Sequence, residues 1–568
     1  MGWRTILVFA LACGSGGSDE GDGGGRDAAG RDSAVTDAGG RDSGLQDAGR
    51  TDAARDAADL PPPGECIVPG STPRYEGDAL SADRVVTSTA DSGAGSLREA
   101  LEDAPDGVVI GFDPSLAGET IELDNELTVS AANATIDGRD APGITLDGRS
   151  RVRVISVDKN RSFTMIGLRI INGRADAGAG GLRLRQADEG RPEQHARVLG
   201  CVFEGNHGPR AGALSAGWRV HLEVTDSVFR NNDGTRGDDR TRPFSGGAIS
   251  TAQSASLRIA RSVFEGNRGY KSGAVYNILQ PIEIIDSAFF NNEAVDGSGA
   301  IFTDGGNPAG PRNESFEGSI EVTRTWIERN RGQKAGGAML LWGYPGDEIT
   351  LDGVTMLDNA CAEDADGESK GGAARIQGKE TITIRRSYFG RSRSEQQGGA
   401  LWIDGPGELR IEMSTFVENT TRGLGGAFVF NGRDGSLRVE SSAFVRNEAG
   451  NACGAFFWAS RDTDVFVQNT FFVENTADDL TSRHVRMPFP TDGGGNLEWA
   501  TERPDRGRVF DEGVFADPLL GEVQPMGCSL GILGSESSPL LGGGVRGADQ
   551  DAAGASRDNP PDIGPFEH

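Results

Sequence analysis

One short motif recurs through most of the chain and limits its fold more than any other feature. A large apolar residue stands three positions before an asparagine, and a glycine motif ending in alanine follows, as in FVENTTRGLGGAFVF at residues 416–430. The marker occupies ten successive places, one of them serine: Asn206, Asn232, Asn267, Asn292, Asn330, Asn359, Ser392, Asn419, Asn447 and Asn475. The basic unit is about 27 residues long, which predicts stacked repeats rather than independent domains.

The residues before each marker predict β-strands. Segments such as LRIEMSTF and LRVESSAF alternate polar and apolar residues, and no helical period appears. A unit of this size cannot bury its apolar face alone, but stacked copies can. Successive coils would pair their strands in parallel about 4.8 Å apart, so that equivalent side chains lie above one another. The pattern predicts an all-β parallel solenoid.

Stacking gives each motif residue a structural role. The apolar position before the marker would form a core column: Phe203, Phe229, Phe264, Phe289, Ile327, Met356, Phe389, Phe416, Phe444 and Phe472. The marker asparagines can adopt a left-handed turn at little cost, and their amides can form a hydrogen-bonded ladder. The glycine pair would supply backbone freedom at a second corner.

The repeats resemble known families. F-x-x-N combined with G-G-A-[ILV] is similar to the repeat of polymorphic outer-membrane proteins, and residues 80–500 resemble a right-handed parallel β-helix of the pectate-lyase type. The stretch SLREA, with Ser96 and Glu99 spaced as a capping box, resembles the start of bacterial surface β-helices. The ending PDIGPFEH resembles their D-I-G-x-F-E terminus. The resemblance implies a right-handed parallel β-helix solenoid with a short N-terminal capping helix and an irregular C-terminal cap, which protect its open ends.

The N-terminal residues indicate export. MGWRTILVFALAC resembles a bacterial lipoprotein signal over residues 1–13, in which Cys13 is acylated; a plain secretory signal is the alternative. Residues 14–63 are rich in Asp, Ala, Gly and Arg and carry too little apolar area to fold, so we expect a disordered tether. An N-terminal cap (64–119), the β-helix repeats (120–500) and a C-terminal cap (501–568) would follow. We expect an outer-membrane lipoprotein, or a cell-surface or secreted bacterial protein.

Charge and hydropathy limit the partners. The net charge is −29 without a basic cluster, which argues against nucleic-acid binding. No run of about 20 apolar residues is present, so membrane contact is expected through the lipid anchor only.

The chain has six cysteines. If Cys13 carries lipid, the remaining five cannot all pair, and the pairing of Cys66 with Cys528 stays open. Cys361 and Cys453 belong to units three coils apart, about 14 Å, which is too far for a disulfide. Cys201 replaces a serine before the core phenylalanine and is expected to be a small packed residue.

The sequence gives no catalytic series. The N-T-D, D-D, G-H-G and R-I-K elements of pectinolytic hydrolases are absent as a set, and no catalytic residue is assigned. One acidic insertion places Asp364, Asp366 and Glu368 at alternate positions, which raises the hypothesis of a calcium site; a solvated loop is the alternative. No other cofactor is expected.

The second residue after the motif alanine should point outward. This position holds several aromatic residues, and a stripe of them could stack on sugar rings or receive a protein, unless long loops cover it: Tyr276, Phe302, Trp402 and Phe457. We therefore expect a lipid-anchored surface β-helix without catalytic activity, which binds a glycan or a surface protein. The alternatives are a polysaccharide lyase or glycoside hydrolase, and an inert structural spacer.

Overall fold

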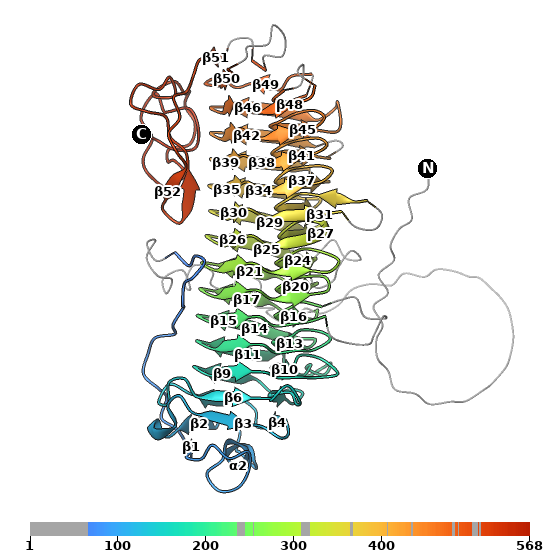
Figure 1. The fold of residues 1–568 in the computed structure, drawn as a ribbon, viewed down its shortest axis with the longest axis vertical. Helices are drawn as coiled ribbons and strands as arrows, with labels where there is room; N and C mark the ends of the chain where they lie inside the picture. Colours follow the sequence, from blue (N-terminus) through green and yellow to red (C-terminus); the bar gives the residue numbers. More distant parts are fainter. Residues whose placement is uncertain are drawn as a thin grey trace, which may run out of the picture. The chain divides into compact units, whose positions relative to one another are not determined.

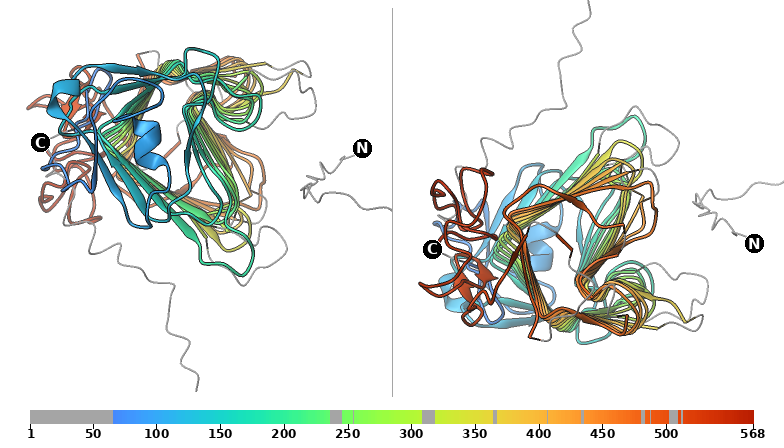
Figure 2. Two further views of the ribbon diagram at one scale, coloured as in Figure 1. Left: turned by 90° about the horizontal axis from the view of Figure 1, so that it is seen from below. Right: turned by 90° about the horizontal axis from the view of Figure 1, so that it is seen from above.

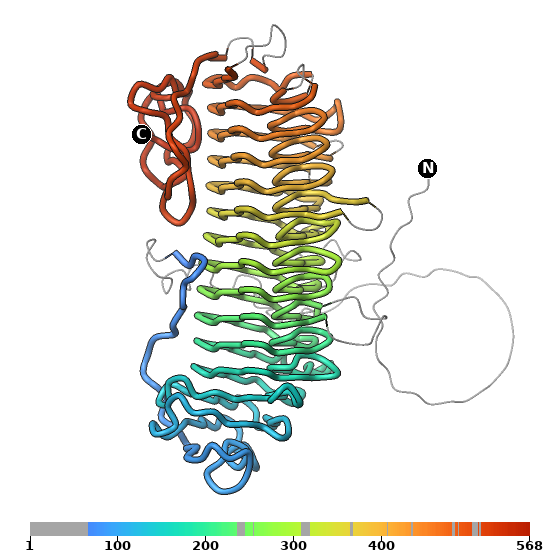
Figure 3. The backbone as a smooth tube through the Cα atoms, viewed as in Figure 1, coloured from blue at the N-terminus to red at the C-terminus, as the bar shows by residue number. Residues whose placement is uncertain are grey.

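The computed structural model describes residues 66–235, 245–253, 255–307, 318–363, 367–405, 407–432, 435–479, 483–486, 488–501, 509–510 and 513–568. Cys13 and the expected tether at 14–63 lie outside these residues. From β1 (Arg84–Val86) to β51 (Val514–Phe515) the described chain winds into stacked coils whose strands pair in parallel, and it is a parallel β-helix (Figures 1 and 3). Three long sheets form the sides of the coils, as the views along the stack show (Figure 2).

Sheet A has fifteen strands, which are β1 (Arg84–Val86), β2 (Val109–Phe112), β5 (Ala134–Asp137), β8 (Phe163–Ile166), β11 (Gln194–Leu199), β14 (Val220–Thr225), β17 (Leu257–Ala260), β21 (Ile282–Ile285), β25 (Gly318–Thr323), β29 (Asp347–Asp352), β34 (Thr381–Arg385), β38 (Glu408–Glu412), β42 (Ser436–Glu440), β46 (Asp464–Gln468) and β49 (Thr491–Asp492).

Sheet B also has fifteen strands, which are β3 (Thr120–Glu122), β6 (Thr145–Asp147), β9 (Arg169–Ile171), β12 (Val202–Glu204), β15 (Val228–Arg230), β18 (Val263–Glu265), β22 (Ala288–Phe290), β26 (Trp326–Glu328), β30 (Thr355–Leu357), β35 (Tyr388–Gly390), β39 (Thr415–Val417), β43 (Ala443–Val445), β47 (Phe471–Val473), β50 (Leu497–Trp499) and β51 (Val514–Phe515).

Sheet C has twelve strands, which are β4 (Leu127–Val129), β7 (Ile155–Val157), β10 (Leu182–Leu184), β13 (Leu214–Ala216), β16 (Ile249–Thr251), β20 (Val275–Ile278), β24 (Ile301–Asp304), β28 (Met339–Trp342), β33 (Ala374–Gln377), β37 (Leu401–Asp404), β41 (Phe428–Phe430) and β45 (Phe456–Trp458).

Sheet D is a short nine-stranded sheet at one corner, which contains β19 (Arg268–Gly269), β23 (Glu293–Ala294), β27 (Arg331–Ala335), β31 (Ala360–Ala362), β32 (Ser369–Lys370), β36 (Arg393–Ser394), β40 (Thr420–Thr421), β44 (Glu448–Ala449) and β48 (Thr476–Ala477). The remaining elements are helix α2 (Leu97–Leu101), the 3-10 helix η2 (Pro114–Leu116) and an antiparallel hairpin of β52 (Gln524–Met526) and β53 (Ser529–Gly531). No helix among the described residues is long and apolar enough to cross a membrane.

The motif phenylalanines form the expected column inside the coils. Phe203, Phe229, Phe264 and Phe289 are fully buried, and successive ring centroids lie 4.6–4.9 Å apart with interplanar angles of at most 3°. This distance matches the spacing of paired strands. The repeat length therefore sets the geometry of the core.

The marker asparagines form a buried amide ladder. Each Oδ1 accepts from the backbone N and from the Nδ2 of the marker one coil earlier, at 2.9–3.1 Å, from Asn206 to Asn359 and from Asn419 to Asn475. Ser392 interrupts the series.

The expectation that the markers adopt a left-handed turn is wrong. The positive φ belongs to the residue before each marker, for example Arg446 at 52° before Asn447 and Glu418 at 56° before Asn419. This turn directs the side chain of the marker asparagine into the coil, where the hydrogen bonds of the ladder satisfy its amide group. The marker is therefore selected for its side chain and not for its backbone.

The glycine pair has two separate roles. Gly398 has φ +67°, which favours glycine. A Cβ added to its neighbour Gly399 would overlap the carbonyl oxygen of Gly426 in the next coil. The first glycine thus permits the corner, and the second permits the close approach of adjacent coils.

Helix α2 covers the first coils. Ser96 Oγ accepts from Glu99 N at 3.2 Å, and the Glu99 carboxylate accepts from Gly95 N at 2.6 Å. The apolar residues Leu97 and Leu101 join the hydrophobic core. Figure 2 shows the helix across the mouth of the coils.

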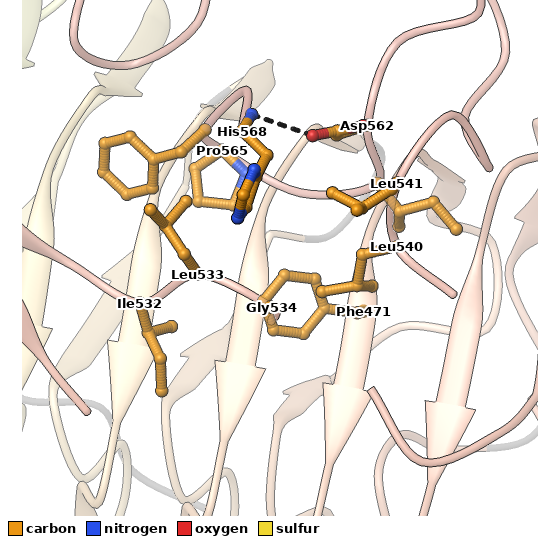
Figure 4. Close-up of a pocket in the computed structure, with 11 residues that line it drawn as sticks. Phe471, Ile532, Leu533, Gly534, Leu540, Leu541, Asp562, Pro565 and His568 are labelled. Atoms are coloured by element: carbon orange, nitrogen blue, oxygen red, sulfur yellow. Dashed lines mark hydrogen bonds between the residues drawn. The ribbon is translucent and has the colours of Figure 1, made fainter. Parts of the chain in front are cut away.

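The expected C-terminal cap divides into two parts. Phe510 enters the core at the last coil and lies 5.9 Å from the Phe472 ring. The final residues instead pack on the outer face of sheet B, beside the coils (Figures 1 and 3). Ile532, Leu540 and Ile563 belong to the same apolar cluster as Phe471. Figure 4 shows this contact, where a cavity of about 10 Å³ leaves room for one water at most.

The terminus PDIGPFEH therefore covers a flank, and its expected role as an end plug is wrong. The outer face of sheet B carries Tyr388, Val417, Val445 and Val473, which are buried in one apolar cluster with residues of the C-terminal segment. Apolar side chains on both faces of a sheet require a cover on both sides.

A disulfide joins the start of the described chain to its C-terminal segment. Cys66 and Cys528 are bonded, with their Cα atoms 5.3 Å apart, across 462 positions of sequence. Next to it, Ile67 packs against the apolar outer side of β15, β18 and β22. Cys201, Cys361 and Cys453 are buried and form no disulfide. This confirms that Cys201 is packed and that Cys361 and Cys453 do not bond to each other.

Candidate functional site

The strands of sheet C present a continuous outer row of side chains. On β37, Leu401 and Ile403 belong to the core, whereas Trp402 between them points away from it. Strand register aligns the equivalent residues of successive coils, which are Ser215, Ser250, Tyr276, Phe302, Leu340, Arg375, Trp402, Val429 and Phe457. We call this set the first outer row. It contains all four residues of the expected aromatic stripe.

Two of the four rings are covered. Tyr276 is 4% exposed, and its ring centroid lies 5.0 Å from that of Phe302. Trp402 is 5% exposed, because Lys370 Nζ and Arg375 Cζ lie 5.0 and 4.8 Å from its ring centroid. The expectation that these two rings face solvent is therefore wrong. The Phe302 ring packs against Tyr276, and cations on the neighbouring coil and turn cover Trp402.

The other two stripe residues are half-buried. Phe302 and Phe457 both retain accessible surface, and the Arg486 guanidinium lies 5.1 Å from the Phe457 ring centroid. The structure thus brings the stripe together in one row but leaves only these two rings within reach of a ligand.

A second outer row lies two residues further along each strand. Asp304, Trp342, Gln377 and Asp404 are in register on β24, β28, β33 and β37, and all are half-buried. Asn431 extends the row, since its Nδ2 donates to Asp404 Oδ1 at 2.8 Å. The sequence contained a signal for this row, because each member is the fourth residue after a motif alanine.

A tyrosine links two carboxyl groups next to this row. Tyr344 Oη donates to Asp304 Oδ1 at 2.8 Å, and Tyr344 N donates to Asp347 Oδ2 at 2.8 Å. Burial raises the pKa of Asp304 and that of Asp347. Burial and the nearby Asp304 charge raise the pKa of the Tyr344 hydroxyl. These groups hold the turns after β24 and β28 together beside Trp342.

The two outer rows combine ring faces with hydrogen-bonding groups. Phe302 and Trp342 offer apolar surface, while Asp304, Gln377 and Asp404 offer donors and acceptors. Gln377 lies two strand spacings, about 10 Å, from Asp304 and one spacing, about 4.8 Å, from Asp404. Sites for small polar ligands generally pair apolar walls with a few placed polar groups. The arrangement suits an extended ligand that has both apolar faces and hydroxyl groups.

The expected calcium ligands are described only in part. Asp364 and Asp366 lie outside the described residues. Glu368 lies 3.6 and 3.7 Å from the amino groups of Lys334 and Lys370. Within the described ranges, no group of three or more His, Cys, Asp or Glu residues is arranged to hold a metal ion.

No protein-family model matches this chain, and no curated protein matches its sequence.

Proposed function

We propose that this protein is a cell-surface β-helix that binds a glycan chain on the outer face of sheet C, without cleaving glycosidic bonds. The observation that carries the proposal is the position of Trp342, whose half-buried side chain lies in register between Asp304 and Gln377. An indole ring can stack on the apolar face of a sugar, and the flanking carboxyl and amide groups can bond to its hydroxyls.

The direction of the rows fits a chain-like ligand. Both rows run along the stack, perpendicular to the strands, so neighbouring coils present similar chemistry at regular intervals. Phe302 lies one coil before Trp342, and Asp404 lies two coils after it. Several coils would therefore contact successive sugar units, each weakly.

A glycan array with the full chain tests the proposal. Trp342→Ala should reduce retention at least tenfold while the melting temperature changes little, because a half-buried ring contributes little to the core. Trp326→Ala is the matched control, since Trp326 is also half-buried but lies on β26 of sheet B. Equal retention by wild type and Trp342→Ala would contradict the proposal, as would release of reducing or unsaturated sugar ends.

We also propose surface attachment through an acylated Cys13. The support is the similarity of residues 1–13 to a bacterial lipoprotein signal. Cys13→Ser should move the protein out of the detergent-soluble membrane fraction. Wild-type protein found free in the medium would contradict the anchor but leave the binding proposal intact.

A further inference from the structure

Three polar side chains from consecutive coils form a chain of hydrogen bonds at the N-terminal ends of strands in sheet A. His221 Nδ1 lies 2.8 Å from Ser256 Oγ, and His221 Nε2 lies 2.5 Å from Glu193 Oε2. Strand pairing produces this alignment, because β11 pairs with β14 and β14 pairs with β17. The three residues come from sequence positions 63 apart at the extremes and are brought together only by the coil register.

The histidine has a fixed orientation. Its ring stacks on His195 of the previous coil, with centroids 4.8 Å apart and an interplanar angle of 9°. Because an ionised carboxylate can only accept, His221 Nε2–H donates a hydrogen bond to Glu193, and in the neutral imidazole the Nδ1 lone pair is then directed at the Ser256 hydroxyl. A hydroxyl, a base within hydrogen-bond reach and a group that orients the base define an activated nucleophile.

A polar cavity lies beside this chain of residues. Its volume is about 360 Å³, and its walls come from the turns that lead into β5, β8 and β11. Lys159, Arg161 and Arg191 line it, and the one lining carboxylate is that of Glu193, which already pairs with His221. Lys159 pairs with Asp188 at 3.1 Å, so the two guanidinium groups give the cavity its positive character.

We propose that Ser256 and His221 are the catalytic residues of an ester hydrolase, with Glu193 as a positioning residue, and that its substrate is a small acyl ester of an anionic alcohol. This activity lies on a different face from the proposed glycan-binding rows and does not depend on them. The anionic part of the substrate would occupy the cavity, since its open cations attract a carboxylate or sulfate. The coil of Ser256 is two strand spacings, about 10 Å, from that of Glu193.

The reaction balances with water as the only co-reactant. Ser256 Oγ attacks the ester carbonyl carbon while its proton passes to His221 Nδ1, and the carbon–oxygen bond to the alcohol breaks as that proton moves to the leaving oxygen. Water then attacks the acyl-serine, gives one proton to His221 and releases the carboxylic acid, and the serine recovers its proton. General base catalysis of this kind contributes about 10²–10⁴-fold, so a slow esterase is expected.

Covalent labelling tests the nucleophile. A fluorophosphonate probe should add one adduct to the full chain, located at Ser256 by peptide mass spectrometry, and Ser256→Ala and His221→Gln should abolish it. Ser319→Ala is the matched control, because Ser319 lies near the start of β25 on the same face without a histidine partner, and its labelling should equal that of wild type. Absence of an adduct on wild type, or an adduct on another serine, would overturn the proposal.

Kinetics test the positioning residue and the substrate class. Wild type should hydrolyse 4-acetoxybenzoate with a kcat/KM at least tenfold above that for neutral phenyl acetate, and Arg161→Gln with Arg191→Gln should remove the difference by raising KM. Glu193→Gln should lower kcat for phenyl acetate at unchanged KM. Equal rates for wild type and Ser256→Ala would overturn the activity, and no preference for the anionic ester would overturn the substrate class.

Discussion

Asn447 Oδ1 accepts two hydrogen bonds from Asn419, one from the backbone N at 3.0 Å and one from the side-chain Nδ2 at 2.9 Å, with both residues fully buried. The same pair of bonds links most neighbouring coils. Ser392 is the exception, because its short side chain donates to Gly390 O at 3.4 Å within its own coil. The ladder is therefore interrupted between Asn359 and Asn419.

Ser392→Asn should stabilise the protein. The new amide would accept from Asn359 and donate to Asn419, which restores the bonds made in the other coils. Each buried hydrogen bond contributes about 0.5–1.5 kcal/mol net, so we expect a gain of about 1–2 kcal/mol in the free energy of unfolding in urea. Asn419→Ser is the opposite control and should destabilise. A loss of stability in Ser392→Asn would show that the coil cannot accommodate the larger side chain.

Phe416→Ala should destabilise the core strongly. Phe416 is fully buried between Phe389 and Phe444, with ring centroids 4.8 and 5.0 Å away. Because adjacent coils are held at a fixed spacing, the cavity should not collapse, and we expect a loss of about 3–5 kcal/mol in the free energy of unfolding. The half-buried Phe457 serves for comparison, and Phe457→Ala should cost clearly less. A loss of a few tenths of a kcal/mol at Phe416 would be inconsistent with this column.

Trp402→Ala should also reduce stability, unlike a solvent-facing aromatic residue. The indole N–H donates to Gln397 Oε1 at 3.0 Å, and the ring packs under Lys370 and Arg375. Loss of a buried tryptophan costs about 3 kcal/mol or more. Differential scanning calorimetry should show a lower Tm for Trp402→Ala than for Trp342→Ala. A Tm unchanged from wild type would indicate that the ring is exposed.

Stability should fall below neutral pH because of His484. Burial, together with the nearby Arg483 charge, lowers the pKa of His484 to about 3. Between pH 6.5 and 3 the unfolded chain binds a proton that the folded chain does not, so this contribution is complete above pH 6.5 and is lost as the pH falls toward 3. At about 1.4 kcal/mol per pKa unit, the loss is about 2 kcal/mol between pH 7.5 and 5.

Urea unfolding of wild type and His484→Gln at these two pH values measures this contribution. Subtracting the two pH dependences removes the titration of all other groups. The wild type should lose about 2 kcal/mol more than the variant. Equal pH dependence in both proteins would mean that His484 is accessible to protons in the folded state.

The sequence predicted the parts of the fold that depend on the repeat period. Strand alternation and the spacing of Phe416 from Asn419 give the core column and the ladder, because each copy occupies the same place in its coil. The left-handed position could not be found in this way. It is occupied by residues as different as Arg446 and Glu474, since the turn constrains the backbone and leaves the side chain free.

Features that depend on contacts between distant parts of the chain could not be predicted from the sequence either. The burial of Trp402 depends on where the side chains of Lys370 and Arg375 lie, and the repeat motif does not determine their positions. The contact between His221 and Ser256 depends on the pairing of β14 with β17, which the repeat motif does not determine. The same holds for the C-terminal segment, whose docking partner is set by apolar residues on the outer side of sheet B.

The disulfide between Cys66 and Cys528 has a mechanical consequence. Tension applied to the chain ahead of Cys66 and behind Cys528 passes through the bonded sulfur atoms and bypasses every coil between them. While the bond is intact, pulling on the two ends cannot peel the strands apart one after another. Reduction of the bond would place the entire stack in the path of the force, so one covalent link determines whether the coils bear load.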